Sequence, residues 1–100
     1  MPKRKSDYQE HLIESLRDPT EAIAYLKAAL EESDMPEVFL LALRNVADAW
    51  GIQQLSRRSK LNRENLYRML SRQGNPSLAS LYAILNALGL KLSVELKEAS

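Results

Sequence analysis

The sequence predicts a small all-α protein of five or six helices that ends in one short β-strand. Apolar residues recur every three or four positions over most of the 100 residues, which is the spacing of one helix face. Residues that start or stop helices return at short intervals, at "DPTE", "DMPE", Gly51 and "GNPS". The last apolar run, "LKLSVELK", alternates with a period of two, as a half-buried strand does. A chain of this length supports one core, so we expect one compact domain.

Two helices are predicted before residue 32. The first, over residues 7–16, has an apolar face of residues four apart: Tyr8, Leu12 and Leu16. The second begins at "DPTE", where Asp18 caps the helix, Pro19 takes its first position and Glu21 reaches back to the cap. Its expected inner stripe is Ile23, Leu26, Ala29 and Leu30.

A third helix is predicted after "DMPE", with Asp34 as the expected cap and Glu37 three residues on. Apolar residues are so dense from Val38 to Trp50 that this helix is expected to lie between the others. Trp50 is expected to be a core residue and not a ligand-stacking one. The third helix is therefore the expected central strut.

The stretch "IQQLSRRS" after Gly51 predicts a short fourth helix, and residues 60–62 predict a turn. Asn62 is the expected N-cap of a fifth helix, whose core face is Leu66, Met69 and Leu70. A sixth helix follows "GNPS" and ends at Gly89. Its expected apolar face is Leu78, Leu81, Tyr82, Leu85 and Leu88.

The formal net charge of +1 conceals an asymmetry along the chain. Residues 7–50 hold ten acidic and three basic side chains, a net charge of −7, whereas residues 51–75 hold six basic and one acidic, a net charge of +5. Residues 1–6 add three basic side chains, and residues 76–100 are balanced. This asymmetry favours an anionic partner for the basic segment and a cationic one for the acidic segment, unless the charges only solvate helix faces.

Composition argues against several classes of protein. The chain has no cysteine, which excludes disulfides and thiolate metal sites, and we expect no metal or cofactor. No run approaches the ~18 apolar residues of a membrane span, and the basic start lacks the apolar stretch of a signal peptide, so we expect a soluble cytoplasmic protein. His11 is the single histidine and no second catalytic base accompanies it, so an enzyme is the least expected class.

Two short helices joined by a tight turn, between a buried helix and an amphipathic one, are the layout of a DNA-reading helix-turn-helix. If Leu66 and Met69 face the core, a rotation of about 100° per residue puts polar side chains of the fifth helix on the opposite surface. The expected base-reading residues are Arg63, Glu64 and Arg68. The expected contacts to the DNA backbone or groove edge are Gln53, Gln54, Asn62, Asn65, Tyr67, Arg72 and Asn75. Four basic residues are expected to attract DNA by their positive charge without reading its sequence: Arg57, Arg58, Lys60 and Arg72.

The stretch "IQQLSRRSKLNRENLYRMLSRQGNPSLASLYAILNALGL" resembles the lambda-repressor-like helix-turn-helix of phage repressors and xenobiotic-response-element regulators. Over residues 7–96 the chain resembles the addiction-module antidote proteins, in pieces such as "HLIESLRDPTEAIAYLKAALEE", "FLLALRNVADAWG" and "NPSLASLYAILNALGLKLSV". Two positions depart from the helix-turn-helix pattern: Lys60 stands where glycine is common, and Ser56 where alanine is usual. A left-handed Lys60 would cost about 1 kcal/mol relative to glycine.

The resemblance implies a cytoplasmic bacterial antitoxin of a type II toxin-antitoxin module. Such a protein neutralises a small basic toxin, ribonuclease-like or of the RelE/ParE type, and represses its own operon as a homodimer on double-stranded DNA with a roughly palindromic operator. Two alternatives stay open: a phage-type repressor without a toxin partner, and a protein-binding adaptor that has lost DNA binding.

We expect four segments within the one domain. Residues 1–6 form a basic flexible N-terminus, residues 7–50 the possible toxin-contacting helices, residues 51–89 the DNA-binding core, and residues 90–100 a strand and tail. A lone strand leaves its backbone N–H and C=O groups unpaired. We therefore expect it to pair antiparallel with a second copy, through a seam of Leu92, Val94 and Leu96, or else to extend a toxin's sheet.

Overall fold

The computed structural model describes residues 5–32 and 34–98 of the chain. These residues contain six α-helices and no β-strand. They are α1 (Lys5–Ser15), α2 (Pro19–Glu31), α3 (Pro36–Trp50), α4 (Ile52–Ser59), α5 (Arg63–Met69) and α6 (Leu78–Ala87). The prediction of an all-α fold with five or six helices is confirmed, and the described residues form six. The predicted flexible N-terminus lies mostly outside the described residues, and α1 already begins at Lys5.

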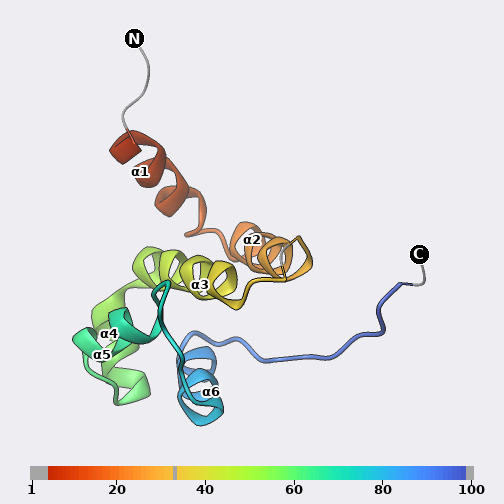
Figure 1. Cartoon of the computed structure of the whole chain (residues 1–100). Coiled ribbons are helices and arrows are strands. Elements are labelled where there is room, and N and C mark those ends of the chain that lie inside the picture. Colours follow the sequence, from red (N-terminus) through yellow and green to blue (C-terminus); the bar gives the residue numbers. More distant parts are fainter. Residues whose placement is uncertain (1–4, 33, 99–100) are drawn as a thin grey trace.

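Helix α3 runs through the middle of the molecule and contacts α1, α2 and α4 (Figure 1). Its buried side chains are Leu40, Ala42, Leu43, Val46 and Ala47. At its end the indole Nε1 of the half-buried Trp50 donates to the carbonyl oxygen of Leu16, 2.6 Å away, which ties α3 to the junction between α1 and α2. The central position of α3 and the packing role of Trp50 are thus confirmed.

A chain of side-chain hydrogen bonds joins the three N-terminal helices. Gln9 Nε2 on α1 donates to Asn45 Oδ1 on α3 at 2.8 Å. Asn45 Nδ2 in turn donates to the Tyr25 hydroxyl on α2 at 2.9 Å. A side-chain amide can donate and accept at once, so Asn45 holds α1 and α2 to the same point of α3.

Short polar side chains cap three of the helices, and two of these caps, Asp18 and Asn62, are the predicted ones. Asp18 Oδ1 accepts from Thr20 N at 2.9 Å, Asn62 Oδ1 accepts from Asn65 N at 2.7 Å, and Ser77 also accepts from its helix. The Asp34 cap is wrong, because α3 begins at Pro36 with Met35 as its N-cap and no side-chain cap bond. Proline suits the first helical position, and this leaves Asp34 one residue too early.

The predicted apolar stripes of α1, α2 and α6 are confirmed in part. Their buried or core-packed members are Leu12, Leu16, Leu26, Ala29, Leu81, Leu85 and Leu88. Exposed members of these stripes are Tyr8, Ile23, Leu30, Leu78 and Tyr82. In α2 the buried residues are Ala22 and Leu26, and in α6 they are Ile84 and Leu85. Where apolar residues are adjacent, the helical period does not say which of them faces the core, because this depends on the neighbouring helix.

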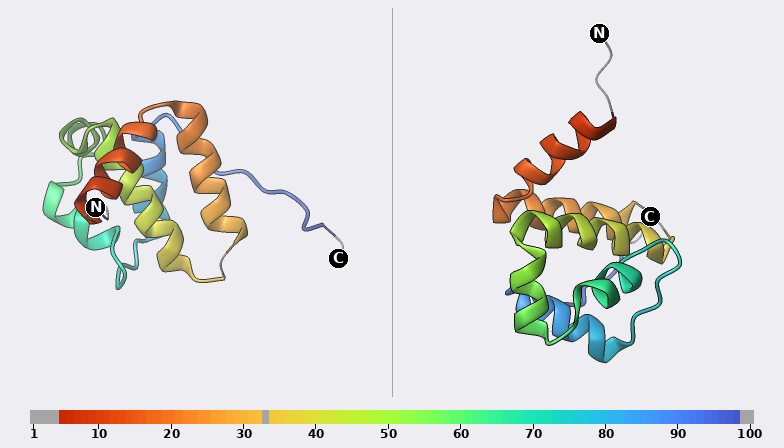
Figure 2. Two further views of the ribbon diagram at one scale, coloured as in Figure 1. Left: turned by 90° about the horizontal axis from the view of Figure 1, so that it is seen from above. Right: turned by 90° about the vertical axis from the view of Figure 1, so that its left-hand side faces the viewer.

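The C-terminal residues 90–98 form no strand and extend away from the helices (Figures 1 and 2). Gly89, with φ 77°, turns the chain out of α6, and Leu90 N donates to Leu85 O at 2.8 Å before the segment departs. The predicted strand is therefore wrong for the single chain. A strand needs a second one for its backbone groups, and the described residues supply none.

Candidate nucleic-acid interface

Helices α4 and α5 form a helix-turn-helix-shaped unit on the side of the molecule away from α2 (Figures 1 and 2). Helix α4 contacts α3, α5 and α6, which fixes it on the core. It ends at Lys60, which has the left-handed conformation (φ 62°, ψ 22°), and α5 starts directly after its cap, Asn62. The predicted bounds of α4, the turn at residues 60–62 and the Asn62 cap are confirmed.

Ser56 closes the turn between α4 and α5. Its hydroxyl donates to the carbonyl oxygen of Leu61 at 2.6 Å. The backbone N–H of Leu61 donates to a second serine, Ser59, whose Oγ lies 3.3 Å away. An alanine at position 56 could make no such bond, so this departure from the usual pattern helps to hold the unusual left-handed Lys60.

The core face of α5 is the predicted one. Leu66 and Leu70 are fully buried, and Met69 packs partly buried against the core. The predicted base-reading residues, Arg63, Glu64 and Arg68, are all exposed. The structure therefore brings these three side chains to one accessible helix, within a segment of net positive charge.

Tyr67 anchors α5 to α3 through its ring and its hydroxyl. The hydroxyl donates to Asp48 Oδ1 at 2.8 Å, and the Arg44 guanidinium lies 4.9 Å from the ring centroid, a cation–π contact. Burial, the hydrogen bond to Asp48 and the negative charge of Asp48 raise the pKa of the Tyr67 hydroxyl above 10.0, although the positive charges of Arg63 and Arg44 oppose the rise. The hydroxyl stays protonated at neutral pH, and its proton is already donated to Asp48 within the chain.

Two predicted DNA-contacting residues of α5 are linked to each other. The Arg68 guanidinium donates to Asn65 Oδ1, while Asn65 N is held by the Asn62 side chain. This hydrogen bond orients the planar guanidinium, which carries further N–H donors that point elsewhere. The side chain of Asn62 serves as a cap, so its oxygen is occupied.

The remaining predicted contacts surround this unit. Gln53 and Gln54 are exposed in the first turn of α4, whose N-cap, Gly51, provides no side-chain bond. Arg72 and Asn75 are exposed in the loop after α5. The basic residues Arg57, Arg58 and Lys60 are exposed as well.

The sequence did not predict the roles that three residues have in this geometry: Arg44, Asp48 and Ser56. Asp48 stands alone among apolar neighbours near the end of the most buried helix, and a lone acid in such a place needs a partner. That signal points to a bond but not to Tyr67 as its donor, which depends on how α5 packs.

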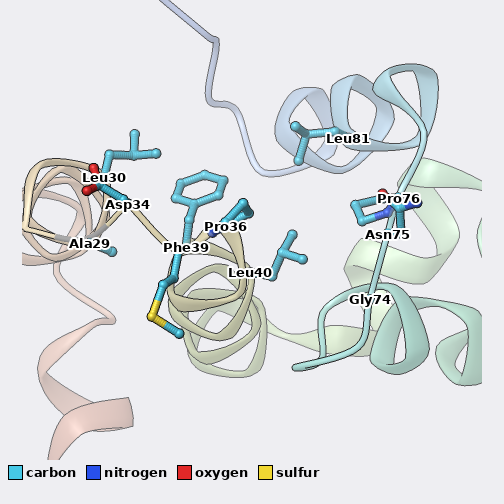
Figure 3. A pocket seen from close by; sticks show the side chains of 11 residues that line it. Ala29, Leu30, Asp34, Pro36, Phe39, Leu40, Gly74, Asn75, Pro76 and Leu81 are labelled. Carbon is cyan, nitrogen blue, oxygen red and sulfur yellow. The ribbon is translucent and has the colours of Figure 1, made fainter.

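An open apolar cavity of about 420 Å³ lies between the turn from α2 to α3 and the loop before α6 (Figure 3). Its apolar lining includes Phe39 and Leu40 of α3, Pro76 of the loop and Leu81 of α6. Asp34 is the charged residue in its lining. The cavity separates the N-terminal helices from the loop that follows α5.

A comparison with protein families matches residues 7–96 to the family described as "Probable addiction module antidote protein". The chain belongs to this family. An uncharacterized protein of Haemophilus influenzae (strain KW20 Rd) is 35% identical over 82 residues, which are 82% of this chain and 84% of that protein. No solved structure matches.

Membership of this family indicates the class and a partner of the protein. Its family is a family of antidotes and not of enzymes, and an antidote implies a toxin as partner. Within the described residues no helix is long and apolar enough to cross a membrane.

Proposed function

We propose that this antidote protein is a DNA-binding antitoxin, which represses its own operon through α4 and α5 and neutralises a small basic toxin with its acidic N-terminal half. The observation that carries the proposal is the exposed, positively charged face of α5, held in place by the Tyr67–Asp48 bond and the Asn62 cap. A helix presented in this way has the width that the major groove admits.

Base reading is assigned to the exposed residues of α5. Arg63 and Arg68 match the O6 and N7 acceptors of guanine, and Glu64 matches the amino group of cytosine. Because Asn65 already holds the Arg68 guanidinium, Arg68 would meet a base with little further loss of side-chain freedom.

Phosphate contacts are assigned to the rim of the same face. Gln53 and Gln54 stand where the free N–H groups of the first turn of α4 also attract anions. Arg72 and Asn75 extend the rim beyond α5, and the positive charges of Arg57 and Arg58 act at longer range. These residues fix the position of the protein on the duplex without reading its sequence.

Toxin binding is assigned to residues 7–50, and we propose that the toxin is a basic protein of the RelE/ParE type. The net charge of −7 on this half would repel DNA and attract a cationic protein, which speeds their encounter. Helix α2 lies on the side of the molecule away from α5 (Figure 1), so both partners could bind at once.

Self-repression by such a protein requires two copies on one operator. Two recognition helices in a two-fold dimer contact half-sites about 34 Å apart, and the operator is then roughly palindromic. We place this activity in the bacterial cytoplasm.

DNA titrations with the region upstream of the protein's own gene test the DNA-binding part. Arg68→Ala should lose roughly 1 to 3 kcal/mol of discrimination at one base pair. The matched control Arg72→Ala should weaken binding evenly across sequences and flatten its salt dependence. Sequence-blind loss in both variants would contradict the assignment of base reading to Arg68, and salt-independent binding would contradict the DNA-binding proposal.

Charge neutralisation tests the toxin-binding part better than truncation, because removing α1 and α2 would expose the buried face of α3. Glu21, Glu31 and Glu32 are exposed on or beside α2, and their replacement by glutamine should slow association with the toxin encoded next to this gene. Unchanged association rates at low salt would contradict the acidic half as the toxin-binding surface.

A further inference from the structure

The C-terminal segment, residues 90–97, presents a row of apolar side chains to solvent. Leu92 is 43% exposed, Val94 98% and Leu96 97%. They alternate with Lys91, Ser93, Glu95 and Lys97. In extended backbone such residues lie on one side of the segment, and a row of this kind on a free edge is an interaction surface.

An apolar groove of about 340 Å³ lies beside the root of this segment. Ile23 and Leu30 of α2 form one wall, although they are 42% and 57% exposed. Leu90, Lys91, Leu92 and Ser93 of the segment line the groove with Phe39 of α3. Leu90 packs against the core, whereas Lys91 and Ser93 are exposed. The apolar side of the segment is therefore the one turned toward the groove, and this side is not covered within the described chain.

We propose that the C-terminal segment of a second copy of this chain covers the groove, paired antiparallel with the first segment about a two-fold axis at Ser93. This rests on the homodimer of the proposed function and adds the surface and the register of pairing. Each chain then places its own Val94 and Leu96 over the groove of the other.

The charges of the segment select this register. With the axis at Ser93, Lys91 faces the partner's Glu95, Leu92 faces the partner's Val94 and Leu90 faces the partner's Leu96. With the axis one residue later, Lys91 faces the partner's Lys97, and like charges directly opposite destabilise a sheet. With the axis between two residues, every leucine faces a polar residue, because the side-chain period is two.

The same register covers the exposed residues of α2. Residues directly opposite in an antiparallel pair point to the same face of the sheet. Because Leu90 packs against the core beside the groove, the partner's Leu96 opposite it lies on the groove side, and so does the partner's Val94 opposite Leu92. They meet Ile23 and Leu30, which are the residues whose exposure contradicts the predicted apolar stripe of α2.

Cysteine cross-linking of the full-length chain tests the register directly, because the natural chain has no cysteine. Ser93→Cys places two cysteines directly opposite each other at the axis, where the Cβ atoms of an antiparallel pair lie about 4.5 to 5.5 Å apart, close to the about 3.5 to 4.5 Å of a disulfide. Mild oxidation should give a covalent dimer faster for Ser93→Cys than for Val94→Cys or Glu95→Cys. Faster cross-linking of Val94→Cys would overturn the register.

Charge swaps give a second readout by sedimentation. Lys91→Glu and Glu95→Lys should each weaken the dimer by roughly 2- to 30-fold, since two symmetric pairs are lost, and the double swap should restore it. Strengthening by Lys91→Glu alone, or no effect of Glu95→Lys, would contradict pairing about Ser93.

A lysine on α2 tests the groove. Leu30→Lys should weaken the dimer, whereas Leu78→Lys, at a similarly exposed leucine on α6, should not. A monomeric natural chain, or cross-linking that needs added toxin, would overturn the inference and identify the toxin's sheet as the partner. Sequence-specific DNA binding that still depends on Arg68 would show that only the dimer surface was wrong.

Discussion

Replacing Tyr67 by phenylalanine removes one hydrogen bond between α5 and α3 and leaves the ring in place. The hydroxyl lies 2.8 Å from Asp48 Oδ1, and a hydrogen bond to a charged group contributes about 1.5 to 3 kcal/mol to stability. Both side chains are half-buried, so water replaces part of the lost bond. We expect Tyr67→Phe to lower the free energy of unfolding by about 1 to 2 kcal/mol, or roughly 4–8 °C in Tm for each kcal/mol.

The effect should depend on pH in one direction. The pKa of Tyr67 is raised in the folded chain, so its protonated form is the one that folding favours. The stabilisation is therefore complete below the unfolded value of 10.0 and is lost as the pH rises through the folded value. The difference between the natural chain and Tyr67→Phe should stay constant near neutral pH and shrink above about pH 10.

Urea unfolding followed by circular dichroism measures these differences, with Tyr82→Phe as the matched control on the exposed face of α6. A double-mutant cycle with Asp48→Ala isolates the hydroxyl–carboxylate term from other effects of either change. Equal stability of Tyr67→Phe and Tyr82→Phe, or additive effects of Tyr67→Phe and Asp48→Ala, would refute the bond as the anchor of α5.

Three further changes test the turn and the loop around α5 by the same measurement. Ser56→Ala should cost about 1 kcal/mol although it restores the usual residue, because the bond to Leu61 is lost; no loss would mean that this bond does not hold the turn. Lys60→Gly should gain up to about 1 kcal/mol by relieving the left-handed conformation, and a loss would contradict that strain. Gly74→Ala should cost about 1 to 3 kcal/mol, since a Cβ there would lie 2.0 Å from the Met69 carbonyl oxygen, and natural stability would show that the loop can shift.

Local signals in the sequence were sufficient to predict the bounds of α4, the turn after it and the cap of α5. Gly51, the left-handed residue 60 and the Asn62 cap depend on neighbours within a few positions, and the bounds of α4 followed from them. The same holds for the core face of α5, where Leu66 and Leu70 have no apolar competitor on the other side of the helix.

Features set by packing between distant segments could not be predicted in this way. In α2, Ala22 is buried and Ile23 is exposed, which depends on the side from which α3 approaches. The Tyr67–Asp48 bond joins residues 19 positions apart, and no local pattern identifies such a pair. The absence of a strand in residues 90–98 has a further reason, because its pairing partner is not in the same chain under the proposed arrangement.

Helix α3 explains how one small chain can carry two separate surfaces. Asn45 and Asp48 are three residues apart and so lie on the same side of α3. Asn45 holds α1 and α2 through Gln9 and Tyr25, whereas Asp48 holds α5 through Tyr67. Because both bonds begin on one buried helix, α3 sets the position of α5 relative to the acidic N-terminal helices. Exposed charges of α2 can therefore be changed without moving α5, and the proposed toxin binding and DNA binding should be separable by mutation.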